Sequence, residues 1–404
     1  MKEKTRVTRI AVLFTLMYMI SYITRINYGA IISEMVTDTG YTKDLLSLAL
    51  TGSFITYGAG QIVSGIFGDR FSPKKLLSVG LGVSVLMNVL IPFCSSSPYL
   101  MLAVWCVNGF AQAFMWPPLV RLMTVLLSEE DYKKVSVKVS LGSSIGTIVV
   151  YLVAPLCISL MGWRWVFFFS ALCGIVMLVF WQIFGVDAQK TVAKKREEQS
   201  GSAPTEKKGL FFFLLMAGIM LPIVLQGMLR DGVTTWMPSY ISETYDLGNA
   251  VSILTGVVLP IFSILCFELA SFIYRKKLKN PMVCAGLFFG VGFLSAVVLN
   301  FVSGSGAILS VLFSALLTGC MHGVNLILIC MIPAFFKGSG KVSTVSGVLN
   351  SCTYVGSALS TYGIALLSEK IGWSFTLAVW AGIAALGTAV CFLCAVPFKK
   401  RFMK

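Results

Sequence analysis

Apolar segments of about twenty residues recur along the whole chain, and no other feature restricts its possible folds as strongly. A helix of twenty residues rises roughly 30 Å, which is the thickness of the hydrocarbon core of a bilayer. Of the residues, 57% are hydrophobic and 12% charged, whereas about 25% of the residues of a soluble domain are charged. The composition therefore excludes a soluble globular fold, and the repeated segments predict an all-α membrane protein.

Twelve of these segments are long enough to cross a membrane as helices. They are 10–32, 45–67, 76–96, 99–124, 135–160, 164–186, 210–240, 247–273, 281–303, 305–333, 342–367 and 373–397.

The charges of the chain are distributed unevenly between the predicted loops. The formal net charge is +15, and with the N-terminus inside, the inside loops hold 26 Lys and Arg against 9 acids. The outside loops hold 3 cations against 6 acids. Because an excess of Lys and Arg is typical of cytoplasmic loops, we predict a multi-pass protein of the cell membrane with both termini cytoplasmic. The positive charge is then an orientation signal, and we expect no nucleic-acid partner.

The longest predicted inside loop, 187–209, is charged and rich in Ser, Gly and Ala, which is typical of a flexible linker. It separates a predicted N-terminal six-helix half, 1–186, from a predicted C-terminal six-helix half, 210–404. Two parallel repeats with a binding site between them at mid-membrane are an established transporter architecture.

Short sequence matches indicate that the two halves are repeats of one another. Lys134-Val-Ser136 before the fifth segment matches Lys341-Val-Ser343 before the eleventh, 207 residues later. Gly162-Trp163 before the sixth segment matches Gly372-Trp373 before the twelfth, at a separation of 210 residues. Similar separations at equivalent places favour a duplicated six-helix unit.

Two arginines lie deep within predicted membrane segments, where ionisable groups are costly and usually functional. Arg25 and Arg230 are 205 residues apart, close to the separation of the repeats. A guanidinium group binds phosphate or carboxylate oxygens with two parallel hydrogen bonds. Two arginines that converge on one cavity would therefore suit a dianion such as a phosphoryl group. The polar neighbours Tyr22, Asn27 and Tyr28 favour a hydrated cavity around Arg25.

A structural role for Arg230, as the ion-pair partner of Asp231, is the alternative. Adjacent residues on a helix point about 100° apart, so we expect this pair to be poorly aligned.

Three further polar residues within the segments have more than one interpretation. Arg121 lies near the inside end of the fourth segment, and we expect a gating or anchoring role for it. Glu268 is either a proton-titrating carboxylate or the partner of Arg275 near the inside surface. His322 is either a hydrogen-bond donor to a substrate or a packing residue.

The sequence contains no phosphate-binding P-loop, nucleophile elbow or pair of metal ligands. We therefore expect neither enzymatic activity nor a metal or other cofactor.

The segment between the second and third predicted helices, Gly65-Ile-Phe-Gly-Asp69-Arg70-Phe-Ser-Pro-Lys74-Lys75-Leu76, resembles the signature loop of the major facilitator superfamily. Its cations face lipid phosphate, and Asp69 and Arg70 are expected to take part in gating. The matching segment of the second half, Phe267 to Lys277, lacks the aspartate. The resemblance implies twelve transmembrane helices in two pseudo-symmetric six-helix halves.

Within that superfamily the chain resembles the organophosphate:phosphate antiporters over most of its length. The resemblance rests on Tyr22-Ile-Thr-Arg25, Tyr57-Gly-Ala-Gly-Gln61, Trp116-Pro-Pro-Leu-Val-Arg121, Leu229-Arg230-Asp-Gly232, Trp236-Met-Pro-Ser-Tyr240, Gly347-Val-Leu-Asn350 and Tyr354-Val-Gly356. It implies that Arg25 and Arg230 bind phosphate and that Tyr22, Tyr57 and Tyr354 line the cavity. We add Gln61, Asn350 and His322 as candidate substrate-binding residues.

Several positions depart from the family pattern. Ile26 and Gln61 occupy positions where some members have lysine, and Gly142 and Ser143 lie near a family histidine. Asp231 adds a negative charge beside Arg230. The site is thus less cationic than in well-known members, so the organic part of the substrate stays open.

Three functions are compatible with these residues. The first is a monomeric antiporter that exchanges an organic phosphate for inorganic phosphate by alternating access. The second is a proton-coupled organic-anion symporter in which Asp231, Glu268 or His322 carries the proton. The third is a phosphate-ester sensor that binds without transport.

Overall fold

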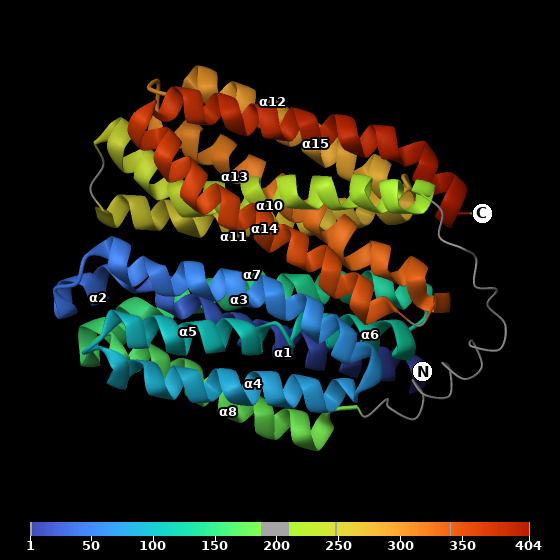
Figure 1. Ribbon diagram of the computed structural model, residues 1–404, viewed down its shortest axis with the longest axis horizontal. Helices are drawn as coiled ribbons and strands as arrows, with labels where there is room; N and C mark the ends of the chain where they lie inside the picture. Colours follow the sequence, from blue (N-terminus) through green and yellow to red (C-terminus); the bar gives the residue numbers. More distant parts are fainter. Residues whose placement is uncertain (1, 187–209, 247–248, 340, 404) are drawn as a thin grey trace. The chain divides into compact units, whose positions relative to one another are not determined.

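The computed structural model describes residues 2–186, 210–246, 249–339 and 341–403, and all secondary structure in these ranges is helical. The predicted linker 187–209 lies outside the described residues. The chain forms two compact units. The first contains the described residues up to 186 together with Phe336–Ser351, and the second contains 210–335 and the residues from Cys352 onward. Figure 1 labels the helices.

The first unit is built from the helices before the linker. These are α1 (Lys2–Ala30), α2 (Ile32–Thr39), α3 (Lys43–Arg70), α4 (Pro73–Leu90), the 3₁₀-helix η1 (Ile91–Cys94), α5 (Pro98–Gln112), α6 (Trp116–Leu126), α7 (Glu129–Met161) and α8 (Arg164–Phe184).

The remaining helices follow the linker. These are α10 (Leu210–Tyr245), α11 (Asn249–Lys276), α12 (Pro281–Val302), α13 (Ala307–Asn325), the π-helix η2 (Leu326–Met331), the 3₁₀-helix η3 (Ile332–Ser339), α14 (Val342–Lys370) and α15 (Trp373–Phe402). Helix α14 passes from the first unit into the second at residue 352.

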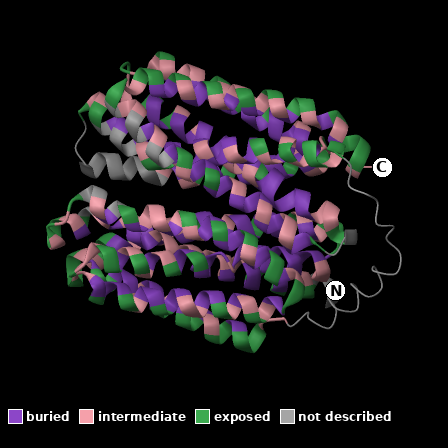
Figure 2. Ribbon diagram, viewed as in Figure 1, coloured by how far each residue is buried: buried purple, intermediate pink, exposed green. Residues whose placement is uncertain are grey.

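The predicted all-α membrane fold is confirmed. Ten helices of the described residues are long and apolar enough to cross a membrane. Helices α3 and α14, which occupy the other two predicted segments, are richer in Ser, Thr and Gly. Exposed surfaces are apolar: along α8, for example, Leu172, Val176 and Ile183 are exposed, whereas Ser170 and Gly174 are buried (Figure 2). Such an outer face is stable only in contact with lipid.

Two of the predicted segments are interrupted rather than continuous. The segment 99–124 forms α5 and α6, joined by a turn at 113–115. Pro117 and Pro118 lack the N–H groups that would bond the preceding turn. The segment 305–333 begins as α13 and then becomes π-helical from Leu326. Such π-helical turns are frequent at functional sites, and this one directly follows Asn325.

Buried polar side chains tie the helices of the first unit together. Asn27 Nδ2 donates to Asn88 Oδ1 at 2.7 Å and to Ser170 Oγ at 2.9 Å. Asn88 and Asn108 both donate to the carbonyl oxygen of Thr24, at 2.8 and 3.2 Å. These bonds link α1, α4, α5 and α8. Because each buried amide is satisfied, the network specifies one arrangement of the four helices.

Gln112 completes the network. Its Nε2 donates to Thr24 Oγ1 and to Ser84 Oγ, each at 2.7 Å, and Ser84 Oγ donates to Asn108 Oδ1 at 2.6 Å.

The Gly-Trp matches of the sequence mark equivalent turns in the two units. Gly162 and Gly372 both have positive φ, 92° and 97°. The following tryptophans donate to carboxylates near the end of each unit's first helical stretch. Trp163 Nε1 bonds Asp38 Oδ2 at 2.8 Å, and Trp373 Nε1 bonds Glu243 Oε2 at 2.7 Å.

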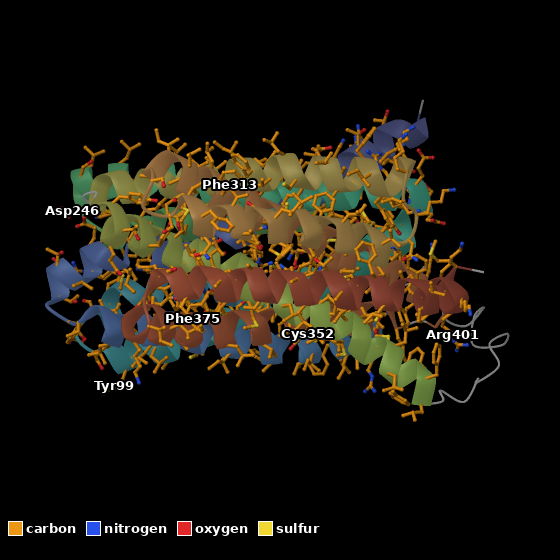
Figure 3. All side chains as sticks on the ribbon, turned by 90° about the horizontal axis from the view of Figure 1, so that it is seen from above. Tyr99, Asp246, Phe313, Cys352, Phe375 and Arg401 are labelled. Atoms are coloured by element: carbon orange, nitrogen blue, oxygen red, sulfur yellow. The ribbon has the colours of Figure 1, made fainter. Side chains whose placement is uncertain are left out.

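These hydrogen bonds join two helices at one end of each unit. In the second unit, the basic end of α15, marked by Arg401, lies at the opposite end from Asp246 (Figure 3).

Candidate functional site

Arg25 lies among aromatic rings in the first unit. Its guanidinium carbon is 4.2 Å from the centre of the Tyr22 ring on α1 and 4.8 Å from that of Tyr57 on α3. Tyr18, one helical turn before Tyr22, packs against Trp116 with ring centres 4.9 Å apart. Cation–π contacts of this kind stabilise a buried guanidinium without neutralising its charge. The structure thus brings together three of the predicted site residues: Arg25, Tyr22 and Tyr57.

Asn27 and Tyr28 do not belong to this surface, and their predicted place in a hydrated cavity is wrong. Both side chains are fully buried. Asn27 belongs to the polar network, and Tyr28 Oη donates to the carbonyl oxygen of Leu46 at 3.2 Å. Residues two positions apart on a helix point about 200° apart, so Asn27 and Arg25 lie on opposite sides of α1.

Gln61 and Asn350 bind one another within the first unit. Asn350 Nδ2 donates to Gln61 Oε1 at 3.0 Å, and Gln61 Nε2 donates to the carbonyl oxygen of Ala113 at 3.1 Å. Both side chains are buried. Contact with a substrate would therefore require these residues to exchange their present hydrogen bonds.

The family histidine position has a packing role in this chain. Gly142 and Gly146 of α7 lie against Thr15 and Met19 of α1, where an added side chain would collide with the α1 backbone.

Arg230 forms a bidentate ion pair with Asp231 in the second unit. Its Nε is 2.6 Å from Asp231 Oδ1 and one terminal nitrogen is 2.8 Å from Oδ2. The expectation that these adjacent residues align poorly is wrong, because the long arginine side chain turns its planar end back onto the neighbouring carboxylate. The other terminal nitrogen donates to Asn325 Oδ1 at 3.2 Å.

Residues of α13 and α14 complete the surroundings of Arg230. His322, one turn before Asn325, interacts electrostatically with both Arg230 and Asp231. Its ring packs edge-on against Phe267 at 5.4 Å. Ser357 of α14 donates to Asp231 Oδ2. Asn325, which adjoins the π-helical turn, and Ser357 were not predicted as site residues, because neither stands out among the many polar residues of the chain.

Two other residues near this cluster lie on the same helices. Tyr354, predicted to line the cavity, is buried on α14 one turn before Ser357. Gln226 lies one turn before Arg230 on α10 and is fully buried. Within the described part of the chain, both polar atoms of its amide lack a hydrogen-bond partner. A buried amide without partners costs about 1–3 kcal/mol or more, so Gln226 is a further candidate for ligand contact.

Asp69 connects the end of α3 to the beginning of α14. It accepts hydrogen bonds from Ser343 N at 3.1 Å, Thr344 N at 2.8 Å and Thr344 Oγ1 at 2.6 Å. These N–H groups belong to the first turn of α14, where a carboxylate is stabilised by the helix dipole. Arg121 forms an ion pair with the same carboxylate.

The structure thus brings Asp69 and Arg121, each predicted separately to have a gating or anchoring role, into one ion pair. Two acids that are close to Arg121 in the sequence bond elsewhere, since Glu129 pairs with Lys133 and Glu130 with Lys134 on α7. Arg70 is exposed in the last turn of α3.

Glu268 lies away from these groups. Its side chain is exposed on α11 beside the exposed residues Leu265, Leu269 and Phe272. The predicted ion pair with Arg275 is not formed, and Arg275 Nε donates instead to the carbonyl oxygen of Ser271 at 3.4 Å.

These groups are suited to noncovalent binding of an anion. Each unit presents one arginine, with aromatic side chains in the first unit and polar ones in the second. No group of three or more metal-ligating side chains occurs among the described residues.

The sequence matches the Major Facilitator Superfamily over residues 14–361, and the chain belongs to this family of membrane transporters. It is therefore a multi-pass membrane transporter and not an enzyme. The fold agrees: the structure of the proton:xylose symporter XylE superimposes with a TM-score of 0.74 at 13% identity, covering 99% of this chain and 96% of that one.

Among curated proteins, the chain is 22% identical to the "Probable hexose phosphate transport protein" of Chlamydia trachomatis, covering 88% of this chain and 84% of the relative. It is 25% identical to the glycerol-3-phosphate transporter of Bacillus subtilis, covering 87% and 84%. It is also 25% identical to the membrane sensor protein UhpC of Salmonella typhimurium, covering 91% and 88%.

Proposed function

We propose that this transporter exchanges an organic phosphate, of the sugar phosphate or glycerol phosphate type, for inorganic phosphate. Support comes from the names of its relatives and, above all, from two arginines at equivalent positions of the two halves, each held within a membrane segment. The proposed transporter is a monomer of the cell membrane with cytoplasmic termini. Its halves 1–186 and 210–404, joined by the linker 187–209, alternate access to the substrate.

In this proposal Arg25 and Arg230 bind the oxygens of one phosphoryl group. Tyr22, Tyr57 and Tyr354 provide aromatic walls for the organic part. Gln226, whose buried amide can both donate and accept hydrogen bonds, contacts hydroxyl groups of the substrate. Asn325 and His322 orient the guanidinium of Arg230, and Gln61 and Asn350 join the site if their mutual hydrogen bond opens during transport.

Asp69, Arg121 and the first turn of α14 form the proposed gate. Because the carboxylate of Asp69 is bound to backbone N–H groups of α14 and to Arg121, separating these elements breaks several charge-assisted hydrogen bonds at once. Transport would require this group to form and break in each cycle.

The ion pair between Arg230 and Asp231 bears on whether the transporter exchanges anions. Charges are costly to enclose within a membrane protein unless a bound ion compensates them, which favours exchange of one dianion for another. Asp231 already compensates Arg230, so an incoming phosphate must compete with this carboxylate.

This same ion pair favours a second candidate function, a proton-coupled organic-anion symporter. Protonation of Asp231 would release Arg230 to bind the anion, with His322 in electrostatic range. Glu268 is exposed on α11, and the proposed symporter does not use it to carry the proton.

Vesicles containing the purified protein distinguish these functions. Exchange predicts that uptake of labelled sugar phosphate requires internal phosphate and persists without a proton gradient. Uptake that requires an inward proton gradient and no internal phosphate would contradict exchange and support symport. Binding of sugar phosphate without any counterflow would instead indicate a sensor, as one relative is named.

A further inference from the structure

A groove on the outer surface of the first unit is not used by any of the groups described above. It has a volume of about 360 Å³ and lies where α3 ends and α4 begins. Its lining residues are Phe67, Phe71, Ser72, Lys75, Leu76, Val79 and Phe114. The volume is at the lower end of the range typical of small-molecule sites.

The walls of the groove are apolar and open to the surroundings of the protein. Phe67, Phe71 and Val79 are 41%, 55% and 61% exposed. The ring of Phe67 packs against those of Phe71 and Phe114, with centres 5.4 and 6.4 Å apart. Because this surface belongs to a membrane protein, the ligand that most simply fills it is a hydrocarbon chain.

The polar end of the groove is the N-terminus of α4, which lacks the usual cap. Ser72 is the N-cap residue, but its side chain makes no capping hydrogen bond. Ser72 is 2% exposed, and its hydroxyl is buried without a partner in the described residues. Pro73 has no N–H group, so the N–H groups of Lys74 and Lys75 are the first donors of the helix. A helix N-terminus of this kind attracts an anion.

The equivalent helix of the second unit is capped by its own chain. There Asn280 precedes Pro281, as Ser72 precedes Pro73, and Asn280 Oδ1 accepts a hydrogen bond from Met282 N at 3.0 Å. Asn280 Nδ2 also donates to the carbonyl oxygen of Ala395 at 2.8 Å. A side-chain cap is therefore present at α12 and absent at α4.

We propose that this groove binds an anionic phospholipid, with an acyl chain against Phe67, Phe71 and Phe114 and the phosphate at Ser72, Lys75 and the N-terminus of α4. The cation and the helix dipole match the charge of the phosphate, and the aromatic walls match the acyl chain. The lipid comes from the leaflet that meets this end of the first unit, which is the cytoplasmic leaflet in the proposed orientation. Since Ser72 closely follows Asp69 and Arg70, a bound lipid would hold the turn that carries the proposed gate.

Native mass spectrometry of the full chain in neutral detergent tests this site. With phosphatidylglycerol and phosphatidylcholine added in equal amounts, we expect one phosphatidylglycerol to be retained in preference. Lys75→Gln should lower its retention roughly five-fold, as expected for the loss of one cation near a lipid phosphate. Ser72→Asn, which supplies the cap found at Asn280, should also lower it, and Val79→Trp, which fills the groove, should abolish it.

Two control variants keep the groove intact. Lys279→Gln removes an exposed cation beside the capped helix α12, and Arg25→Lys alters the proposed substrate site; both should retain the lipid as the wild type does. Wild-type retention in both Lys75→Gln and Val79→Trp would overturn the proposal, and so would an equal loss in Lys279→Gln. An excess of inorganic phosphate should leave the lipid bound. Complete displacement by inorganic phosphate would show a site for free phosphate and overturn the lipid assignment.

Discussion

The two units surround Arg25 and Arg230 with different side chains. In the first unit, the rings of Tyr22 and Tyr57 lie against the guanidinium of Arg25. In the second unit, Asp231 binds the edge of the Arg230 guanidinium through two hydrogen bonds. A ring attracts a cation through its quadrupole, whereas a carboxylate forms charge-assisted hydrogen bonds with it. The two arginines thus have different neighbours, aromatic rings in the first unit and a carboxylate in the second.

The hydrogen bonding of the buried amide side chains also differs between the two units. Buried amides of the first unit are fully hydrogen-bonded across four helices, whereas in the second unit the buried amide of Gln226 has no partner among the described residues. In the proposed function, an anion that binds Arg230 must therefore compete with Asp231, whereas at Arg25 it meets the rings of Tyr22 and Tyr57. Variants of the residues in each unit should reveal this difference.

The largest effect is expected for the arginines themselves. Arg25→Lys and Arg230→Lys keep the charge but lose the paired N–H donors, each worth about 1.5–3 kcal/mol with a charged acceptor. We expect each variant to lower exchange of labelled phosphate by roughly 100-fold when two such bonds are lost. Lys279→Gln, on the outer surface, serves as the control. Exchange at wild-type rates in both arginine variants would refute the proposed site.

The next effect concerns stability. Asn88→Leu removes one of the two hydrogen bonds that Asn27 Nδ2 donates and one of the two that the carbonyl oxygen of Thr24 accepts in the first unit, and should destabilise the protein by about 1–3 kcal/mol. Ser295→Ala in the second unit removes one bond, from Ser295 Oγ to the carbonyl oxygen of Phe313, and should cost about 0.6 kcal/mol. Thermal unfolding in detergent compares the two; an equal loss would show that the network has no special role.

A smaller effect is expected for Asp231→Asn. This variant removes the carboxylate that competes with phosphate for Arg230, so we expect the KM for inorganic phosphate to fall about three- to ten-fold, as for ~1 kcal/mol of coupling. The pH dependence of uptake decides between the two proposed functions. If uptake by the wild type depends on a proton gradient and this dependence vanishes in Asp231→Asn, symport is supported.

The smallest effect is expected at Asp38, near the end of α2 in the first unit. The indole N–H of Trp163, with the charge of Arg164, holds the pKa of Asp38 below its usual value. A lowered pKa in the folded state stabilises the protein above pH ~4, and this contribution is lost as the pH falls through the folded-state pKa.

Asp38 is half exposed, so solvent screens its ion pair and Asp38→Asn should cost about 0.5 kcal/mol at neutral pH. The difference in unfolding free energy between variant and wild type should shrink under acidic conditions. A difference that is constant between pH 3 and pH 7 would contradict this origin.

Sequence alone predicted the all-α membrane fold, because long apolar segments are rare, and it singled out Arg25 and Arg230 as candidates because charges within such segments are rarer still. It did not predict the ion pair of Arg230 with Asp231, which depends on side-chain torsions rather than on helical spacing. The network of Thr24, Asn88 and Asn108 was also missed, because single polar residues in apolar segments carry no pattern of their own. The contact of Asp69 with α14 joins residues 275 positions apart, and local sequence contains no signal for it.

The central claim is that Arg25 and Arg230 bind the same phosphoryl group. A double-mutant cycle measures this directly: the affinity for inorganic phosphate is determined for the wild type, Arg25→Lys, Arg230→Lys and the double variant. If both arginines bind one group, the loss in the double variant should differ from the sum of the two single losses by about 0.5–3 kcal/mol. Losses that add to within about 0.3–0.5 kcal/mol would show that the two residues act independently, and would contradict the claim.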